Sequence, residues 1–352
     1  MRANLIRRYA RSLASIGVIV ATTAVLTSCG SADDSAPAAA GEPGVIRFTF
    51  SPDPVWDWLT DQGIREEMEK ESGITIIDSS SWDEFALFAG GHADIVSLGT
   101  YELPELEAAT DVDTVTFGKY NRAKDIFVVA ADSDAKTITD LPDGAKIGVF
   151  STVGSTLIWS SIIRKLHDKD FRPDGGDYEL IVADSQNLPQ LLGRGDLDAA
   201  IIDPQYGIVE LSSGKIKPIY DGKSTAEMYA DTFAPGHKGL MSNLFVTQKE
   251  WYDSHPEEVA FFLELWQRGL QEWSQHRDEI IAAYPEHFAA TNEADQEFIK
   301  NYLDTQFDWF VDSVYLDQEW IDAENGVFTA MEETGQAEEG IGDDIDFAVV
   351  AH

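Results

Sequence analysis

The run Gly154-Ser155-Thr156 combines residue types that can hold an anion. It follows the apolar segment 147–150, and an amphipathic segment that carries Trp159 comes directly after it. At the start of a helix the first N–H groups are unpaired and the helix dipole is positive, so a carboxylate, sulfonate or nitrate group can bind there. Serine and threonine are also frequent N-cap residues, so a helix cap without a ligand is the alternative interpretation.

Three other loops follow predicted strands and carry side chains suited to binding: Ser51–Asp53, Leu98–Tyr101 and Asp203–Tyr206. In open α/β sheets, ligands bind beyond the carboxyl ends of the strands. We therefore expect these loops and residues 151–156 to face one cleft. The predicted ligand-binding residues are Ser51, Asp53, Trp56, Trp82, Thr100, Tyr101, Arg122, Gly154, Ser155, Thr156, Asp203 and Tyr206.

Several of these side chains also have a purely structural interpretation. Trp56 and Trp82 can stack on a planar or aliphatic ligand, although tryptophan at helical spacing lies more often in a core. Asp203 can accept a hydrogen bond from an amine or a hydroxyl, or it can cap the next turn. Arg122 and Lys124 form a basic cluster that can pair either with an anionic ligand or with surface carboxylates.

The sequence lacks the common signatures of catalytic and metal sites. It contains no Gly-x-Ser-x-Gly elbow, no phosphate-binding P-loop and no His-Glu-x-x-His pair. Its 7 histidines show no metal-like spacing, and acidic residues are too frequent for any one pair to indicate acid–base catalysis. We therefore expect a protein that is not an enzyme and that uses no metal or cofactor.

Strand and helix patterns alternate from residue 45 onward, which is typical of an α/β protein with mainly parallel sheets. Apolar runs predict strands at 46–50, 95–97, 114–117, 127–130, 147–150, 180–183, 199–202 and 244–247. Amphipathic runs predict helices at 54–70 and 81–88 and mainly helical structure from 255 to 333, followed by a loose acidic tail.

The sequence also contains an internal repeat. Strand 46–50 leads into a loop and a helix with Trp56, and about one hundred residues later strand 147–150 leads into a loop and a helix with Trp159. Each unit then continues through a glycine and an aspartate into another strand. Two lobes of the same plan explain the repeat most simply. We place lobe 1 at 45–132 and 238–352, and lobe 2 at 133–237.

The first 28 residues have the pattern of a bacterial secretory signal. Four arginines precede the apolar stretch 13–26, which is too short and too rich in Ala and Thr for a stable membrane span. The stretch ends in Leu-Thr-Ser-Cys-Gly, similar to the lipobox of bacterial lipoproteins, so Cys29 is expected to carry a lipid. An ordinary signal peptide with a chance cysteine is the alternative. Residues 29–44 are small, polar and rich in Pro and Gly, which predicts a flexible tether.

The charge balance excludes several classes of partner. The chain has 25 basic and 63 acidic residues, and removal of a signal with four arginines leaves a net charge of 21 − 63 = −42. Nucleic-acid-binding proteins need basic surface, so that class is excluded, as is tight contact with anionic lipid beyond the anchor. Cys29 is the only cysteine, so we expect no internal disulfide and no cysteine-rich metal site.

Taken together in their order, several modest motifs resemble one family. It comprises the periplasmic-type solute-binding proteins for nitrate, sulfonates, taurine and thiamine-pyrimidine precursors, the NMT1/THI5-like family. The resemblance runs from about Ile46 to Phe262. The motifs that show the resemblance are Ile46–Pro54, Ala89–Ile95, Thr139–Val149 leading to Gly154–Thr156, Gly195–Ala200 with Asp203-Pro204, and Asn243–Trp251 with His255–Glu257.

The resemblance implies a type 2 periplasmic-binding-protein fold. In that fold two α/β lobes enclose a ligand cleft and are joined by two hinge crossovers, which we place near 131–134 and 234–240. It also implies a monomer that works with an ABC permease and an ATPase, at the outer face of the cell membrane or in the periplasm. The tryptophans in the first loops favour an organic anion over nitrate, for example a sulfonate or an aromatic or alkyl carboxylate such as a phthalate-like acid.

Three alternatives stay open at this point. The ligand can be a thiamine pyrimidine precursor instead of an organic anion. The two-lobe fold can carry an enzyme that acts on an anionic substrate, such as a dehydratase. A lipoprotein that senses its ligand and signals to a membrane partner is the third. A pyrimidine synthase with the same fold relies on a cysteine-rich motif, and with Cys29 alone the chain cannot supply it.

Overall fold

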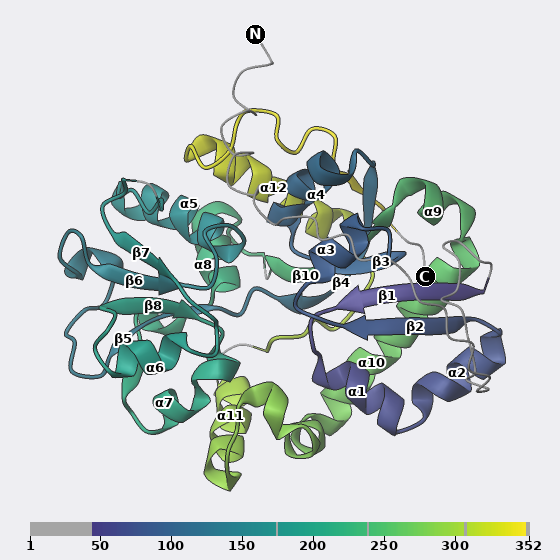
Figure 1. Ribbon diagram of the computed structural model, residues 1–352, viewed down its shortest axis with the longest axis horizontal. Coiled ribbons are helices and arrows are strands. Elements are labelled where there is room, and N and C mark those ends of the chain that lie inside the picture. Colours follow the sequence, from purple (N-terminus) through teal and green to yellow (C-terminus); the bar gives the residue numbers. More distant parts are fainter. Residues whose placement is uncertain (1–43, 174, 238, 306–307, 350–352) are drawn as a thin grey trace, which may run out of the picture. The chain divides into compact units, whose positions relative to one another are not determined.

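The computed structural model describes residues 44–173, 175–237, 239–305 and 308–349. The expected signal segment, Cys29 and all but the last residue of the expected tether lie outside these residues. Within the described residues two mixed β-sheets form, and helices pack against both, so the α/β fold class is confirmed (Figure 1).

The first sheet has the strand order β11-β4-β10-β3-β1-β2. Its strands are β1 (Val45–Phe50), β2 (Thr75–Ser80), β3 (Ile95–Leu98), β4 (Thr114–Arg122), β10 (Met241–Gln248) and β11 (Asp346–Phe347). Strand β1 pairs in parallel with β2 and β3, and β10 runs antiparallel to β3 and β4. We call this sheet and the helices that pack on it lobe 1.

The second sheet has the order β7-β6-β8-β5-β9. Its strands are β5 (Ile126–Ala130), β6 (Lys146–Val149), β7 (Glu179–Val182), β8 (Ala199–Ile202) and β9 (Ile216–Pro218). Here β6 pairs in parallel with β7 and β8, and β5 runs antiparallel to β8 and β9. This sheet and its helices form lobe 2.

The two sheets share one plan, which confirms the internal repeat. Strands β2, β1, β3, β10 and β4 of lobe 1 correspond in order and direction to β7, β6, β8, β5 and β9 of lobe 2. In each sheet the antiparallel strand, β10 or β5, is the first strand that the chain forms after it has crossed over from the other lobe. The expected mainly parallel pairing is therefore corrected to mixed pairing.

The first passage between lobes lies earlier than expected. Strand β5 belongs to the second sheet, so the chain crosses at residues 123–125 and not near 131–134. The alternating apolar side chains of β5 explain this placement: Phe127 and Val129 enter one core of lobe 2, and Ile126 and Val128 enter the core on the opposite face. The return passage lies between Phe233 and Met241.

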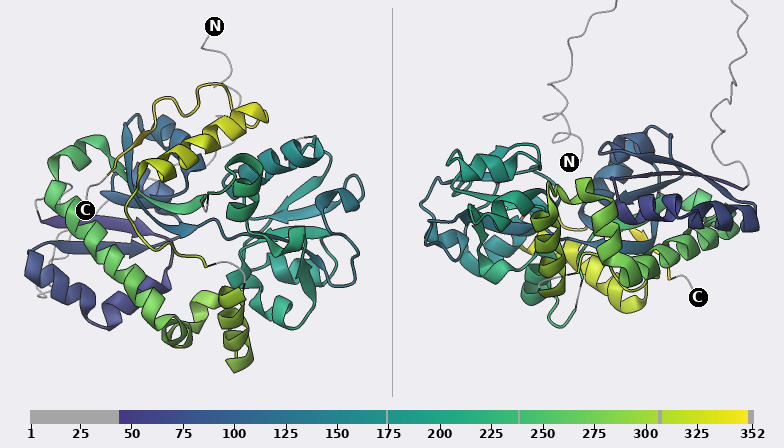
Figure 2. Two further views of the ribbon diagram at one scale, coloured as in Figure 1. Left: turned by 180° about the vertical axis from the view of Figure 1, so that it is seen from behind. Right: turned by 90° about the horizontal axis from the view of Figure 1, so that it is seen from below.

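The helices lie mainly between strands and in the C-terminal third (Figure 2). They are α1 (Pro54–Asp61), α2 (Ile64–Ser72), α3 (Glu84–Ala89), η1 (Thr100–Glu102), α4 (Leu103–Thr110), η2 (Ile138–Asp140), α5 (Ser155–His167), α6 (Leu188–Gly193), η3 (Pro204–Gly207), α7 (Ile208–Ser212), η4 (Tyr220–Gly222), α8 (Thr225–Phe233), α9 (Lys249–Ser254), α10 (Pro256–Ala283), η5 (Pro285–Phe288), α11 (Glu293–Thr305) and α12 (Gln318–Glu333).

Helix α1 shows how local sequence sets these boundaries. Asp53 is its N-cap, accepting hydrogen bonds from the backbone N–H groups of Val55 and Trp56, and Pro54 fills the first turn, where no partner for its nitrogen is needed. Gly63, with φ of 72°, separates α1 from α2, so the single helix expected over 54–70 is two helices.

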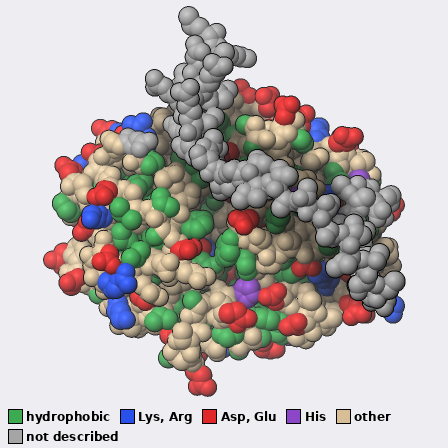
Figure 3. All heavy atoms as spheres, in the orientation of Figure 1, with side chains coloured by type: hydrophobic (Ala, Val, Ile, Leu, Met, Phe, Trp, Pro, Cys, Tyr) green, Lys and Arg blue, Asp and Glu red, His purple; other side chains and the backbone are tan. Residues whose placement is uncertain are grey.

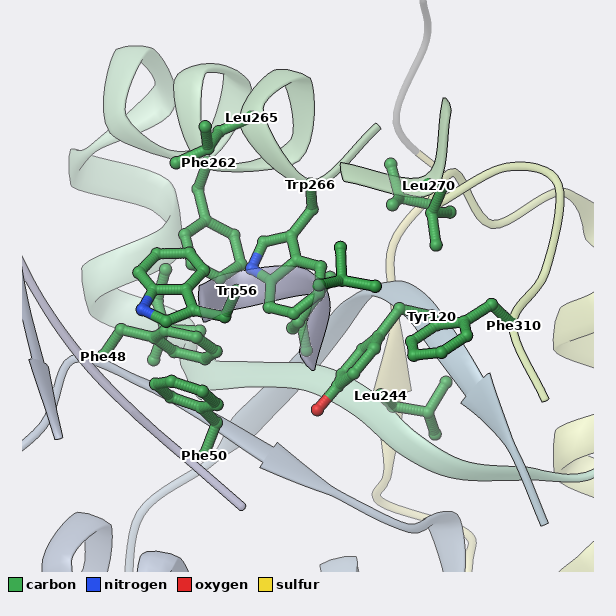
Figure 4. Close-up of a cluster of buried hydrophobic side chains, with 14 of the residues drawn as sticks. Phe48, Phe50, Trp56, Tyr120, Leu244, Phe262, Leu265, Trp266, Leu270 and Phe310 are labelled. Atoms are coloured by element: carbon green, nitrogen blue, oxygen red, sulfur yellow. The ribbon is translucent and has the colours of Figure 1, made fainter. Parts of the chain in front are cut away.

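Lobe 1 is built around an aromatic core (Figure 4). Phe48 stacks on Phe50 with ring centroids 4.6 Å apart, and Tyr120 packs on Trp266 of α10 at 4.5 Å. Aromatic pairs add to the free energy gained from area burial alone, by about 0.5–1.5 kcal/mol each. This core holds the carboxyl ends of the first sheet's strands in fixed positions.

The C-terminal helices touch both lobes. Ile321 of α12 belongs to the core of lobe 1, whereas Val327 and Met331 belong to a core of lobe 2. Helix α12 also contacts α5, and α11 contacts α7. The expected assignment of all residues after 238 to lobe 1 therefore needs correction, because α11 and α12 join the two lobes.

Acidic side chains outnumber basic ones on the face shown in Figure 3, as the totals of 63 and 25 require. In the described part of the chain, no helix has the length and apolar character needed to cross a membrane.

Candidate ligand-binding cleft

A cavity of about 250 Å³ lies between the two lobes, at the carboxyl ends of their parallel strands. The loops after β1, β3, β6 and β8 all reach it, as expected from the sequence. Residues of the first crossover and of the segments after α10 complete its wall. The polar part of the lining includes Ser51, Asp53, Glu84, Glu102, Asn121, Lys124, Asp125, Ser151, Ser155, Thr156, Asp203, Gln205, Asn243 and His287.

Eight of the twelve predicted ligand-binding residues line this cavity: Ser51, Asp53, Trp82, Tyr101, Gly154, Ser155, Thr156 and Asp203. They come from both lobes, so the fold brings together loops that are up to 203 − 51 = 152 positions apart in the sequence, from Ser51 to Asp203. Trp56, Thr100, Arg122 and Tyr206 are not part of the lining.

Trp56 and Thr100 point into the protein and not into the cavity. Trp56 is 2% exposed and stacks on Trp266, because its position on α1 faces the core of lobe 1. Thr100 is fully buried, and its hydroxyl donates a hydrogen bond of 2.5 Å to Glu324 on α12. Both residues therefore stabilise the loops and helices that form the cleft, without lining the cavity themselves.

Arg122 and Tyr206 lie near the cavity without lining it. The guanidinium of Arg122 donates to the backbone oxygen of Asp308, 3.0 Å away, so it helps to hold the segment after α11. The ring of Tyr206 meets that of Trp82 edge-on with centroids 6.2 Å apart. Trp82 belongs to lobe 1 and Tyr206 to lobe 2, so this aromatic pair bridges the lobes at the edge of the cavity.

The start of helix α5 has the geometry of a tight turn whose hydroxyls are already bonded. Gly154 has φ of 69° and ψ of −142°, a conformation that only glycine adopts without strain. Thr156 Oγ1 donates to the backbone oxygen of Ser151 at 2.6 Å. The Ser155 hydroxyl donates to the carboxyl group of Asp125. Both hydroxyls therefore serve the protein's own acceptors.

Two carboxyl groups meet where the first crossover approaches the loop after β8. Asp125 and Asp203 both line the cavity and are hydrogen-bonded to each other. Burial raises the pKa of Asp125 well above its usual range, and the neighbouring charge of Asp203 raises it further. Both carboxyl groups present oxygens to the cavity.

Three more carboxyl groups line the lobe 1 side. Burial raises the pKa of Asp53 to about 6, against the opposing effects of His287 and of its own helix-capping bonds. Burial likewise raises the pKa of Glu84 to about 7 and that of Glu102 to about 7. These shifts mean that the wall is costly to ionise without a compensating charge.

Two basic groups in the lining already have partners. Lys124 places its ammonium 5.2 Å from the centre of the Trp309 ring, a cation–π geometry. His287 Nε2 lies 2.7 Å from Asp57 Oδ2. Burial lowers the pKa of His287, but this hydrogen bond and the charge of Asp53 raise it, and the net shift is upward.

Sequence reasoning missed several lining residues for identifiable reasons. Asp125 lies in a crossover that the sequence places further along the chain, although the neighbouring Lys124 belongs to the predicted basic cluster. His287 and Trp309 come from a region that reads only as helices, and no local signal marks them as part of a cleft. Their position follows from long-range packing of the C-terminal segments against lobe 1.

Within the residues described, no group of three or more His, Cys, Asp or Glu side chains could hold a metal ion. The cavity is lined by aromatic rings and is rich in carboxyl groups.

A sequence model of the NMT1/THI5-like family matches residues 74–280. The match spans more than half of the chain, and the chain therefore belongs to the NMT1/THI5-like family. A search of curated protein sequences found no match.

Solved structures with a similar fold include solute-binding proteins. The periplasmic aliphatic sulphonate binding protein SsuA from Escherichia coli is 14% identical with a TM-score of 0.67, over 88% of this chain and 94% of that one. The Candida albicans CA3427 gene product, described as having the generic periplasmic binding protein fold, is 15% identical with a TM-score of 0.62, over 88% and 98%.

A third similar structure is the ligand-binding component of an ABC-type import system from Staphylococcus aureus. It is 11% identical with a TM-score of 0.57, over 86% of this chain and 96% of that one. At these identities the likeness shows the fold, which is that of the periplasmic binding proteins.

Proposed function

We propose that this protein captures a small organic solute outside the cytoplasm and delivers it to an ABC importer. The observation that carries the proposal is the cavity between two lobes of one plan, reached by the carboxyl ends of strands from both. A solute held there contacts both lobes at once, so its binding energy can draw them together. The family membership and the fold of the similar structures support the same function.

Lipid anchoring through Cys29 is part of this proposal and rests on the lipobox-like sequence alone. An anchored binding protein stays close to its permease, so its local concentration there is high even when few copies are made. The permease and the ATPase are the partners that the proposal requires. Its working place is the outer face of the cell membrane or the periplasm.

Two features favour the organic anion expected from the sequence: Lys124 in the lining and the N-terminus of α5 at the cavity. The similar sulphonate-binding protein is consistent with such a ligand. The bonded hydroxyls of Ser155 and Thr156 and the five carboxyl groups of the wall count against it.

A thermal-shift screen over sulfonates, carboxylates, amines and pyrimidines tests solute capture. A ligand present at 100 times its Kd adds about 2.7 kcal/mol to the free energy of unfolding, which shifts the midpoint measurably. Deletion of the gene should then abolish uptake of the solute that binds. Uptake that continues at the normal rate would contradict the importer function.

The same screen separates capture from catalysis. We propose binding without chemical change, so a solute recovered after long incubation should have its original mass and concentration. Conversion of the solute in proportion to the amount of protein would instead favour the enzyme alternative.

A further inference from the structure

Five carboxyl groups line the cavity. Asp125 and Asp203 present carboxyl oxygens from lobe 2, and Asp53, Glu84 and Glu102 add carboxyl groups from lobe 1. An anionic solute would add negative charge to a wall whose carboxyl groups are already costly to ionise, as their raised pKa values show. A positively charged solute would instead relieve the cost of holding buried carboxylates near one another.

Two acceptor atoms in the lining have no hydrogen-bond partner among the described residues. Asn121 is only 6% exposed, lines the cavity, and its Oδ1 is unpaired. Glu84 Oε2 is likewise buried and unpaired. A buried acceptor atom without a partner destabilises the protein, and a small rotation of either side chain would bring its oxygen to a donor on a bound solute. Trp309 Nε1 is the unpaired donor of the lining.

The groups that would bind an anion are already engaged. Lys124 sits over the Trp309 ring, and His287 is bonded to Asp57. The hydroxyls at the start of α5 donate to Asp125 and to the backbone of Ser151. Four groups that could donate to an anion are therefore already engaged within the protein.

Aromatic side chains are exposed on the walls of the same cavity. Trp82 of lobe 1 is 54% exposed and Phe150 of lobe 2 is 56% exposed, although both are large and apolar. Aromatic faces attract organic cations through the ring quadrupole. Exposed rings on both lobes can cover a bound cation from two sides when the lobes close.

We propose that the solute is a small organic cation, an ammonium or amidinium compound whose N–H groups donate to Asp125, Asp203 and Asn121. This inference rests on the solute-capture function proposed above. Its hydrocarbon part would lie against the rings of Trp82 and Phe150. The proposal names the charge and the donor groups of the solute, which neither the family nor the similar structures define.

Three probes of nearly the same size and shape test which solute charge the cavity prefers: benzamidinium is positive, benzamide is neutral and benzoate is negative. Titration calorimetry on the wild-type chain should show benzamidinium binding at least tenfold more tightly than benzamide, with benzoate weakest. Benzoate as the tightest probe overturns the cation proposal and leaves solute capture in place. Equal affinities, or no binding of any probe, also overturn it, and the uptake test then decides solute capture independently.

Matched variants test which carboxyl group is responsible for the preference for a cationic probe. Asp203→Asn should weaken benzamidinium at least tenfold and change benzamide little, because a negative charge beside the bound cation is lost. Asp125→Asn should have the smaller effect, since the pKa of the Asp125 carboxyl group is already raised. Asp196→Asn is the control, since this exposed carboxylate of lobe 2 pairs with Arg194 outside the cavity. Equal losses for both probes, or a loss in the control alone, overturn the assignment to this carboxyl pair.

Discussion

The indole ring of Trp56 stacks on that of Trp266 with centroids 5.5 Å apart and planes 25° from parallel. This contact joins α1, which starts at the cleft, to the long helix α10 behind it (Figure 4). Trp56 thus fixes the position of the loop that carries Asp53 without touching a solute. Trp82, by contrast, stands exposed at the cavity.

These two tryptophans form a matched pair for mutation. Trp56→Ala should lower the free energy of unfolding by about 3–5 kcal/mol, because it leaves a hole in a close-packed core. Trp82→Ala should change stability by less than about 0.5 kcal/mol and should weaken solute binding. Chemical denaturation of both variants measures the stabilities. A large loss for Trp82→Ala would show that this ring is structural.

Stability should fall as the pH rises from about 4.5 to about 7. Burial raises the pKa of Glu324 from 4.5 to about 7, so the folded chain binds more protons than the unfolded chain between these values. The loss of stability therefore accumulates between about pH 4.5 and pH 7 and levels off above pH 7, at about 3 kcal/mol for this group. Glu84 and Glu102, whose pKa values are also raised to about 7, act in the same direction.

Glu324→Gln isolates the contribution of this residue. A glutamine can still accept from the backbone N–H of Met241 and contact the hydroxyl of Thr100, as the carboxyl group does now. The variant should be more stable than wild type at pH 8 and closer to it at pH 5.5. Thermal unfolding at both pH values measures the difference. Glu319→Gln, on the exposed side of the same helix, is the control and should keep the wild-type profile.

Solute binding should draw the lobes together about the passages at residues 123–125 and 234–240. Small-angle X-ray scattering with the solute identified by the screen should give a smaller radius of gyration than without it. Trp82→Ala, at an equal degree of saturation, should compact less, because the ring contributes to the contact between lobes. An unchanged radius at saturation would contradict a closing cleft.

Cys29→Ala should release the protein from membranes into the soluble fraction without changing its affinity for the solute. The reason is that Cys29 is the only cysteine and stands at the end of a lipobox-like sequence. Membrane fractionation followed by immunoblotting compares the variant with wild type. A variant that stays in the membrane fraction would contradict lipid attachment at this residue.

Much of the strand framework could be predicted from the sequence, because buried strands carry unmistakable apolar runs such as Ile126–Ala130. Strand β2 escaped prediction, since it is an edge strand whose residues Thr75–Ser80 are mostly exposed and partly polar. Strand β11 escaped because its two residues lie in an acidic tail that reads as unstructured.

The candidate site could be predicted only as far as strand ends locate it. The loops after four strands were placed correctly, because the carboxyl ends of parallel strands converge. The direction of each side chain was not predictable: Thr100 turns inward to Glu324, while its neighbour Tyr101 lines the cavity. Contributions from His287 and Trp309 depend on contacts across the whole chain, which no local pattern encodes.

The central position of β10 in the first sheet has a consequence for how the chain folds as it is made. All five strands of the second sheet lie within residues 126–218. In the first sheet, β3 and β4 both pair with β10, which begins only at Met241, so they stay unpaired on that side until β10 has been synthesised. Lobe 2 can therefore complete its sheet while lobe 1 still exposes unpaired strand edges. We expect lobe 1 to be the late-folding half and the one more exposed to mispairing while the chain folds.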